Sequence, residues 1–279
     1  MSRLVSYFIA FHDAYYPENT REFTMEEIGR LFIWYSVARS TIQSEAKVPV
    51  LLRERFLPVY DAGRMQEEHW YQNSMLFHLW RNPSVIEASE YVGFGQYDFG
   101  LSKEGFDLCT DILKDTTSDV GSAERGSADV CIGMLPYSLD TLWEVVSREA
   151  WDTMFTSRYN DRREQNHSLI FGLWHQPFLC HAFIIPTWFF MEMMEFMELV
   201  LPELKELAGG ERHLAGTIER ALAIYLNFAF AEGRLRRCVV RHAIRHNDHQ
   251  RLADPFRGIL ATPGKDAQEL QDGHSERSV

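Results

Sequence analysis

Short apolar runs alternate with longer amphipathic stretches along this 279-residue chain. The runs are rich in the β-branched and aromatic residues that strands favour; they are RLVSYFIAF, EYVGFGQ, VCIGML, FLCHAFII and RRCVVRHAI. The stretches carry apolar side chains at helical spacing; they cover residues 24–44, 69–81, 102–114, 141–155, 187–208 and 218–233. Because strands alternate with helices, the pattern predicts an α/β sheet with helices on both faces.

Local signals sharpen some of these boundaries. Thr24 and Glu27 form a T-x-x-E capping box, which predicts a helix from there to about Ser44. Pro49 confines the short run KVPVLL to an edge strand or a loop. The chain turns polar after Phe256, so we expect one domain over residues 1–256 and a disordered tail over residues 257–279.

Charge and cysteine content exclude several classes of protein. A net charge of −12 argues against a general nucleic-acid binder, whose affinity depends on basic surface. The four cysteines form no C-x-x-C pair, which argues against a disulfide framework or a zinc site and favours a reducing, cytoplasmic location. The longest apolar stretch is interrupted by His181, Pro186 and Glu192, so we expect no transmembrane helix and leave membrane-surface contact open.

Several common catalytic motifs are missing from the sequence. There is no G-x-G-x-x-G, no P-loop and no G-x-S-x-G, which disfavours dinucleotide enzymes, P-loop NTPases and serine hydrolases. His242 and His246 have the spacing of H-E-x-x-H but lack its glutamate, so a zinc peptidase is disfavoured as well.

One acid ends the strand-like run EYVGFGQYD. Ligands of α/β sheets collect beyond the carboxyl ends of the strands, which places Asp98 at the rim of a potential pocket. Asp98 could bind Mg²⁺ or Mn²⁺, since such ions often need only one or two protein carboxylates beside substrate phosphates. It could equally form a turn or cap the helix that follows.

A second acid and a basic cluster are further candidates. Glu219 follows a glycine-rich turn, and we expect it in the first turn of a helix, as a helix-dipole partner or as a general base. The stretch from 234 to 245 is basic in an otherwise acidic protein. It could be a solvated strand and turn, or it could neutralise a diphosphate through its arginines, which are Arg234, Arg236, Arg237, Arg241 and Arg245.

Five blocks of the sequence, taken in order, resemble a known family. They are YFIAFHDAYY, YQNSMLFHLWRN, EYVGFGQYDF, CHAFIIPTWFFMEMMEFMELVLPEL and LAGTIERALAIYL, and they span roughly residues 4 to 230. The likeness is to the glycosyltransferase-like family encoded with capsular polysaccharide synthesis genes, which is similar to GT-A-fold enzymes that use nucleotide-sugars. It implies a GT-A-like, Rossmann-like mixed central sheet with helices on both faces.

The resemblance also implies a metal site. In GT-A enzymes a strand ends in a D-x-D motif that holds a divalent cation against the diphosphate. Gln96-Tyr97-Asp98 occupies that place with one acid, whereas the better-known members of the look-alike family carry a basic H-Y-R-R-like run. The resemblance therefore implies Mn²⁺ or Mg²⁺ held by Asp98, with His242 as first choice and His246 as second choice for a histidine ligand.

The remaining roles are implied in the same way. The end of the first strand, at Ala10, Phe11 and His12, would contact the nucleoside, and Arg241 and Arg245 would face the diphosphate. Glu219 resembles the acid of the xED position, which deprotonates the acceptor hydroxyl in inverting enzymes.

The implied function is transfer of a sugar from a nucleotide-sugar, with a UDP-sugar expected, to a glycan acceptor. Two alternatives stay open at this point. One is a non-catalytic nucleotide- or carbohydrate-binding relative, and the other is a metal-dependent nucleotidyl- or phosphotransferase.

Overall fold

The computed structural model describes most of the first 246 residues. The described ranges are 3–12, 20–38, 42–61, 70, 72–97, 99–118, 129–135, 148–169, 178, 181–210, 213–241 and 243–246. At 44, 47, 117, 118, 245 and 246 the description covers the main chain alone. The expected tail over residues 257–279 lies outside these ranges, so the domain boundary at Phe256 stays a prediction.

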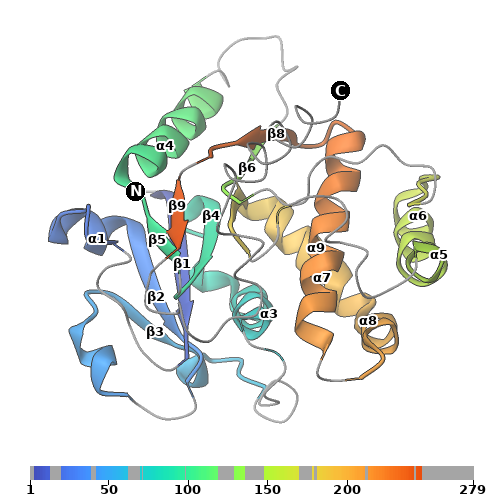
Figure 1. The fold of residues 1–279 in the computed structure, drawn as a ribbon, viewed down its shortest axis with the longest axis horizontal. Helices are drawn as coiled ribbons and strands as arrows, with labels where there is room; N and C mark the ends of the chain where they lie inside the picture. Colours follow the sequence, from blue (N-terminus) through green and yellow to red (C-terminus); the bar gives the residue numbers. More distant parts are fainter. Residues whose placement is uncertain are drawn as a thin grey trace, which may run out of the picture.

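A seven-stranded mixed sheet forms the centre of the α/β fold (Figure 1). Its strands are β1 (Arg3–Phe11), β2 (Phe32–Ser36), β3 (Leu51–Arg53), β4 (Ser89–Gln96), β6 (Val130–Gly133), β7 (Phe183–Pro186) and β8 (Arg236–Val239). They lie in the order β3-β2-β1-β4-β7-β6-β8. Only β7 runs against its neighbours β4 and β6, so the other six strands share one direction.

Alternating residues of the strands supply two hydrophobic cores, one on each face of the sheet. On β1, Tyr7 and Ile9 pack toward α1 (Met25–Leu31) and α4 (Lys103–Ser118). Phe8 and Ala10 pack toward the other face, which is covered by α3 (Asn73–Arg81), α7 (Thr187–Leu199), α8 (Leu201–Ala208) and α9 (Leu214–Ala231). Figure 1 shows these two groups of helices on opposite sides of the sheet. The predicted arrangement with helices on both faces is confirmed.

The second strand of the sheet was not predicted from the sequence. The capping box of Thr24 and Glu27 is present, with the Thr24 hydroxyl and the Glu27 carboxylate each bonding the other's main-chain N–H. The helix it starts ends at Leu31 rather than near Ser44, and the next five residues form the fully buried strand β2. The apolar spacing of FIWYS fitted a helix as well as a strand, and tertiary burial decided between them.

Other boundaries match the sequence expectations more closely. Helix α3 ends before Asn82, Pro83 opens the 3₁₀ turn Pro83–Val85, and β3 is the edge strand that Pro49 predicted. The expected helix over residues 187–208 is split into α7 and α8, because Pro202 in the first turn of α8 cannot continue the hydrogen bonds of α7. Two further 3₁₀ turns are Gln43–Lys47 and Glu54–Phe56.

Helical structure continues past residue 155, where the helical stretch expected from the sequence ended. Helix α5 (Arg148–Trp151) continues through a π-helical turn, Asp152–Thr156, into α6 (Ser157–Arg163). Glu164 then ends the helix in the left-handed conformation, with φ 53°.

A separate two-stranded sheet links the middle of the chain to its last described residues. The antiparallel strands β5 (Phe99–Leu101) and β9 (Ile244–His246) pair Phe99 with His246 and Gly100 with Arg245. The single last strand expected over RRCVVRHAI is therefore two strands, β8 and β9, in different sheets. Among the described residues, no helix is long and apolar enough to cross a membrane.

Candidate active site at the carboxyl edge of the sheet

Strands β1 to β4 all end along one edge of the central sheet. Phe11 aligns with Ser36, Ser36 aligns with Arg53, and Ala10 aligns with Gln96. In α/β sheets, ligands bind outside such carboxyl ends. The sequence candidates Ala10, Phe11 and Gln96 therefore share one edge.

The three candidates at the end of β1 differ in what they can offer a ligand. Ala10 and Phe11 are completely buried, and their side chains belong to the two hydrophobic cores, so only their main chain could contact a nucleoside. His12 is half-buried and makes an edge-to-face contact with Tyr97, with 4.7 Å between ring centroids. This contact brings together two residues that the sequence predicted for the same site.

Gln96 connects the end of β4 to the start of α3. Gln96 is 8% exposed, and its Oε1 accepts a long hydrogen bond of 3.5 Å from Gln72 Nε2. Asn73, which follows Gln72, is the first residue of α3. Its Nδ2 donates to the main-chain oxygen of Ala215 in the first turn of α9. Helices α3 and α9 thus both begin at the carboxyl edge.

Glu219 lies near this edge but not where the sequence placed it. Helix α9 begins at Leu214, so Glu219 stands in the second turn, and the first turn of α9 contains no acid. The expectation that the helix dipole directly holds Glu219 ionised is therefore wrong, because that effect fades beyond the first turn. Glu219 is half-buried and carries an interaction with its surroundings.

The metal candidates fall largely outside the described residues. Asp98 and His242 are not described, and neither is the side chain of His246. Their main-chain surroundings are described: β5 begins one residue after Asp98, and its first residue, Phe99, pairs with His246. Within the part of the chain that the structure describes, no three His, Cys, Asp or Glu residues are grouped to hold a metal.

The basic residues between 234 and 245 are spread over β8, β9 and the residues around them and do not form one cluster. Arg236 donates to Thr116 on α4, and Arg237 lies 4.8 Å from the ring centroid of Phe178. Arg241 is exposed, beyond the carboxyl end of β8, and the main chain of Arg245 lies in β9 beside Gly100. Arg234 and Arg236 bond to helices on opposite faces of the sheet, so the expectation that all five face one ligand is wrong for these two.

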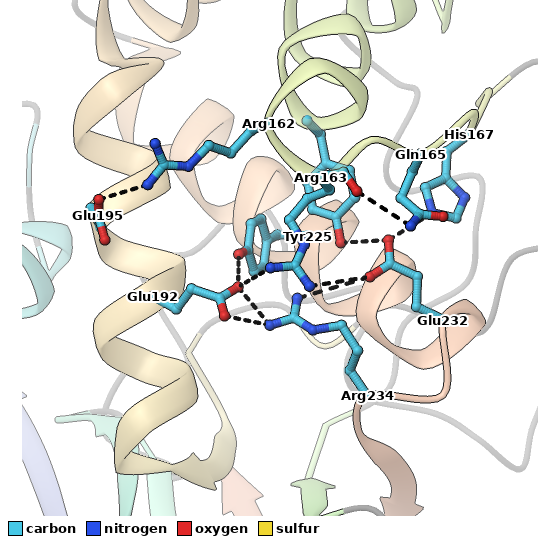
Figure 2. Close-up of polar contacts among 10 residues, drawn as sticks. Arg162, Arg163, Gln165, His167, Glu192, Glu195, Tyr225, Glu232 and Arg234 are labelled. Carbon is cyan, nitrogen blue, oxygen red and sulfur yellow. Dashed lines mark hydrogen bonds and ion pairs between the residues drawn. The ribbon is translucent and has the colours of Figure 1, made fainter.

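Arg234 belongs to an ionic network that joins α6, α7 and the end of α9 (Figure 2). Glu192 accepts hydrogen bonds from Tyr225 Oη at 2.6 Å and from Arg234 Nη2 at 2.5 Å. Glu232 accepts from Tyr159 Oη and pairs with His167 Nε2, both at 2.8 Å. Figure 2 shows Arg163 and Arg234 between the two carboxylates.

The electrostatics of this network are those of a structural element. Burial alone would raise the pKa of Glu192, but hydrogen bonds from Tyr225 and Arg234 outweigh burial and hold that pKa below 4.5. The network precedes β8, which runs parallel to β4, so it stands at the amino edge of the sheet, away from the candidate site.

A buried carboxylate that was not expected from the sequence lies at the carboxyl edge. Glu45 is 2% exposed, accepts from Ser36 Oγ at 2.5 Å, and pairs with Arg53 Nε at 2.8 Å. Ser36 and Arg53 are the last residues of β2 and β3. A buried acid therefore holds a one-third exposed guanidinium at the same edge. No local motif around Glu45 would have revealed this.

Two other residues at the edge, Asn73 and His181, were not among the site residues expected from the sequence. They form a buried pair, with 2.9 Å between His181 Nε2 and Asn73 Oδ1. The available signal was a lone histidine inside the apolar run FLCHAFII.

Comparison with known proteins supports the fold assignment. No family model matches the chain, and no curated protein does. The apo structure of the bifunctional glycosyltransferase WbbM matches with a TM-score of 0.50 and 11% identity, over 88% of this chain and 46% of that chain. The chain thus spans just under half the length of that protein. The likeness shows a glycosyltransferase-like fold of the GT-A type.

Two other solved structures also match. Glucosyl-3-phosphoglycerate synthase from Mycobacterium tuberculosis, in complex with phosphoglyceric acid, gives a TM-score of 0.37 at 13% identity, over 88% of this chain and 72% of that one. Mouse xyloside xylosyltransferase 1 in its apo form gives 0.40 at 9% identity, over 88% of this chain and 98% of that one.

Proposed function

We propose that this chain is a glycosyltransferase that moves a sugar from a nucleotide-diphosphate sugar to a hydroxyl of a glycan, as the capsular polysaccharide family resemblance implies. The observation that carries the proposal is the convergence of β4, α3, α9 and β9 at the carboxyl edge of a GT-A-like sheet. A UDP-sugar is the first donor to test. The resemblance to WbbM concerns the fold, and the transfer reaction is our inference from it.

The proposed donor site lies between the ends of β1 and β4. His12 and Tyr97, whose rings are in contact, would border the nucleoside. Arg241 and Arg245 would face the diphosphate, since guanidinium groups pair with phosphate oxygens in a bidentate manner. Arg234 and Arg236 have no part in this, because both are bonded to helices.

Asp98 and one histidine would hold Mn²⁺ or Mg²⁺. One carboxylate and one imidazole leave coordination positions for diphosphate oxygens, which fits either ion. The pairing of Phe99 with His246 brings the main chain of His246 beside the residue that follows Asp98, which favours His246 over His242 as the histidine ligand. When bound there, the cation would neutralise charge on the diphosphate leaving group.

Glu219 would be the general base. Its carboxylate would accept the proton of the acceptor hydroxyl while that oxygen attacks the anomeric carbon and the bond to the diphosphate breaks. Direct displacement of this kind inverts the anomeric centre. Glu219 is half-buried near the start of a helix that begins at the carboxyl edge, which supports this role.

One experiment separates this proposal from its alternatives. The full chain is incubated with UDP-, GDP- and TDP-sugars and with nucleoside triphosphates, in Mn²⁺ and in EDTA. Slow, Mn²⁺-dependent hydrolysis of one nucleotide-sugar is the expected result. Tight binding without turnover would indicate a non-catalytic relative, and cleavage of a triphosphate would indicate a nucleotidyl- or phosphotransferase; either result would contradict the proposal.

A further inference from the structure

His181 combines three unusual features at the entry to β7. The residue is 1% exposed, its main chain has a φ of 54°, and burial lowers the pKa of its imidazole to about 4. A positive φ is uncommon for a residue other than glycine and is retained where the surroundings enforce it. The imidazole ring is therefore neutral at physiological pH. The main chain of His181 is held in a conformation that a residue other than glycine rarely adopts.

The hydrogen bonds of Asn73 determine which nitrogen of His181 carries the proton. Asn73 Nδ2 donates to the main-chain oxygen of Ala215 at 3.3 Å, so its Oδ1 faces the histidine as an acceptor. His181 Nε2 must then be the protonated nitrogen, because only a donor can bond to Oδ1 at 2.9 Å. The other nitrogen, Nδ1, has no partner among the described residues.

These contacts form a directed chain between three elements. His181 Nε2–H donates to Asn73 on α3, and Asn73 donates to Ala215 on α9. Ala215 lies four residues before Glu219, so its carbonyl is the acceptor that an α-helix assigns to the N–H of Glu219. Asn73 therefore holds the carbonyl to which the main chain of Glu219 is anchored.

We propose that Asn73 and His181 are positioning residues that fix the start of α9, and through it the carboxylate of Glu219, relative to the carboxyl edge. This inference rests on the proposed role of Glu219 as general base. Its structural half, the fixing of α9, does not depend on that role. Asn73 is completely buried and bonds through both ends of its amide, so no other common side chain of its size reproduces the pair of contacts.

The test uses Asn73→Leu, which keeps the branched shape of the side chain and removes both hydrogen bonds. We expect kcat to fall at least tenfold while the donor KM changes less than twofold, because the donor is held by other residues. Amide hydrogens of residues 217–222 should exchange faster than in the wild type. The double variant Asn73→Leu/Glu219→Gln should turn over no more slowly than Glu219→Gln alone, since both changes act on one carboxylate.

Asn227→Leu is the matched control. Asn227 is another buried asparagine, and its Nδ2 donates to the carbonyl of Ala223 in the C-terminal half of the same helix. This variant should lower the melting temperature with kcat unchanged. His181→Asn, which tolerates a positive φ and keeps an N–H donor, should retain more kcat than His181→Leu.

Each result decides the question. Multiplicative losses in the double variant, or normal kcat in a folded Asn73→Leu protein, would overturn the positioning role. If the wild type shows no transfer at all, or Glu219→Gln remains fully active, the proposed function fails, and hydrogen exchange alone then decides. Unchanged exchange at residues 217–222 in Asn73→Leu would refute the fixing of α9, and faster exchange would support it.

Discussion

The ring of Tyr7 on β1 occupies the space in which Gly93 on β4 would carry a Cβ atom. The two residues are aligned in neighbouring parallel strands, and a Cβ at Gly93 would overlap Cδ2 of the tyrosine. Gly95 is restricted in the same way, since its Cβ would lie 2.8 Å from the Tyr7 hydroxyl. The glycines of YVGFG therefore make room for one fully buried aromatic ring.

Gly93→Ala should destabilise the protein. The added methyl group has no room in the core, and overpacking of this kind costs about 1–3 kcal/mol in the free energy of unfolding. Gly29→Ala is the control: a Cβ there meets nothing within 4 Å, and alanine in the interior of α1 should raise stability by up to about 1 kcal/mol. Urea unfolding measures both changes. Equal stability of the two variants would contradict the packing argument.

Asp98→Asn should weaken the binding of UDP in Mn²⁺ while the melting temperature hardly changes. An amide is a much poorer ligand for a hard divalent cation than a carboxylate. Calorimetric titration with UDP in Mn²⁺ and in EDTA provides the measurement. The control is Asp111→Asn, which removes an acid on α4 with a side chain 67% exposed. A wild type that binds UDP equally well in both buffers would show that Asp98 has no metal role.

Glu219→Gln should lower kcat by about 10²–10⁴-fold, which is the usual contribution of a general base. The donor KM should stay the same, because the amide keeps the size of the side chain and the donor contacts other residues. Steady-state kinetics with saturating acceptor test this. The exposed acid Glu206 on α8 supplies the control variant, Glu206→Gln. A product with the anomeric configuration of the donor would argue against direct displacement.

Arg234→Met should destabilise the ionic network at the end of α9. The substitution removes the guanidinium whose Nη2 donates to both carboxylate oxygens of Glu192. We expect a cost of about 1–3 kcal/mol, less than for a fully buried pair because Glu192 is one-third exposed. The double variant Arg234→Met/Glu192→Leu should recover part of this loss, since no unpaired charge remains. Chemical unfolding at pH 7 measures both. A double variant that loses the sum of the two single effects would show that the pair is not coupled.

The same network predicts how stability depends on pH. The folded state holds the pKa of Glu192 below 4.5, its ordinary value, so the carboxylate stabilises the fold above pH 4.5 and loses this effect as the pH falls further. The stability difference between wild type and Glu192→Gln should therefore be larger at pH 7 than at pH 3.5. A difference that stays constant over this range would contradict the role of the charge.

Much of the fold followed from patterns within a few residues. The capping box at Thr24 and the buried strand over residues 89–96 were predictable because capping and periodicity are local properties. Strand β2 was not, since its apolar spacing continues that of α1 without a break. What separates the two is burial on both faces of the strand, and burial depends on neighbours distant in the sequence.

The candidate site was predictable in its parts but not in its arrangement. The end of a strand-like run indicated Asp98, because ligands collect there in any α/β sheet, and the family resemblance implied His12 and Gln96. The pairing of β5 with β9 and the contact between Asn73 and His181 join residues far apart in the chain, and no local pattern encodes them. The helical turn that carries Glu219 was misplaced, because α9 begins at Leu214, inside the glycine-rich segment that was expected to precede the helix.

The pairing of β5 with β9 has a consequence for biosynthesis. The strands of the central sheet, and both helices that begin at the site edge, are complete by Val239. Strand β5 obtains its partner only when Ile244–His246 leaves the ribosome, so its edge stays open during most of translation. A nascent chain therefore cannot pair β5 before its final described strand emerges, and a chain released too early would expose an unpaired strand to aggregation.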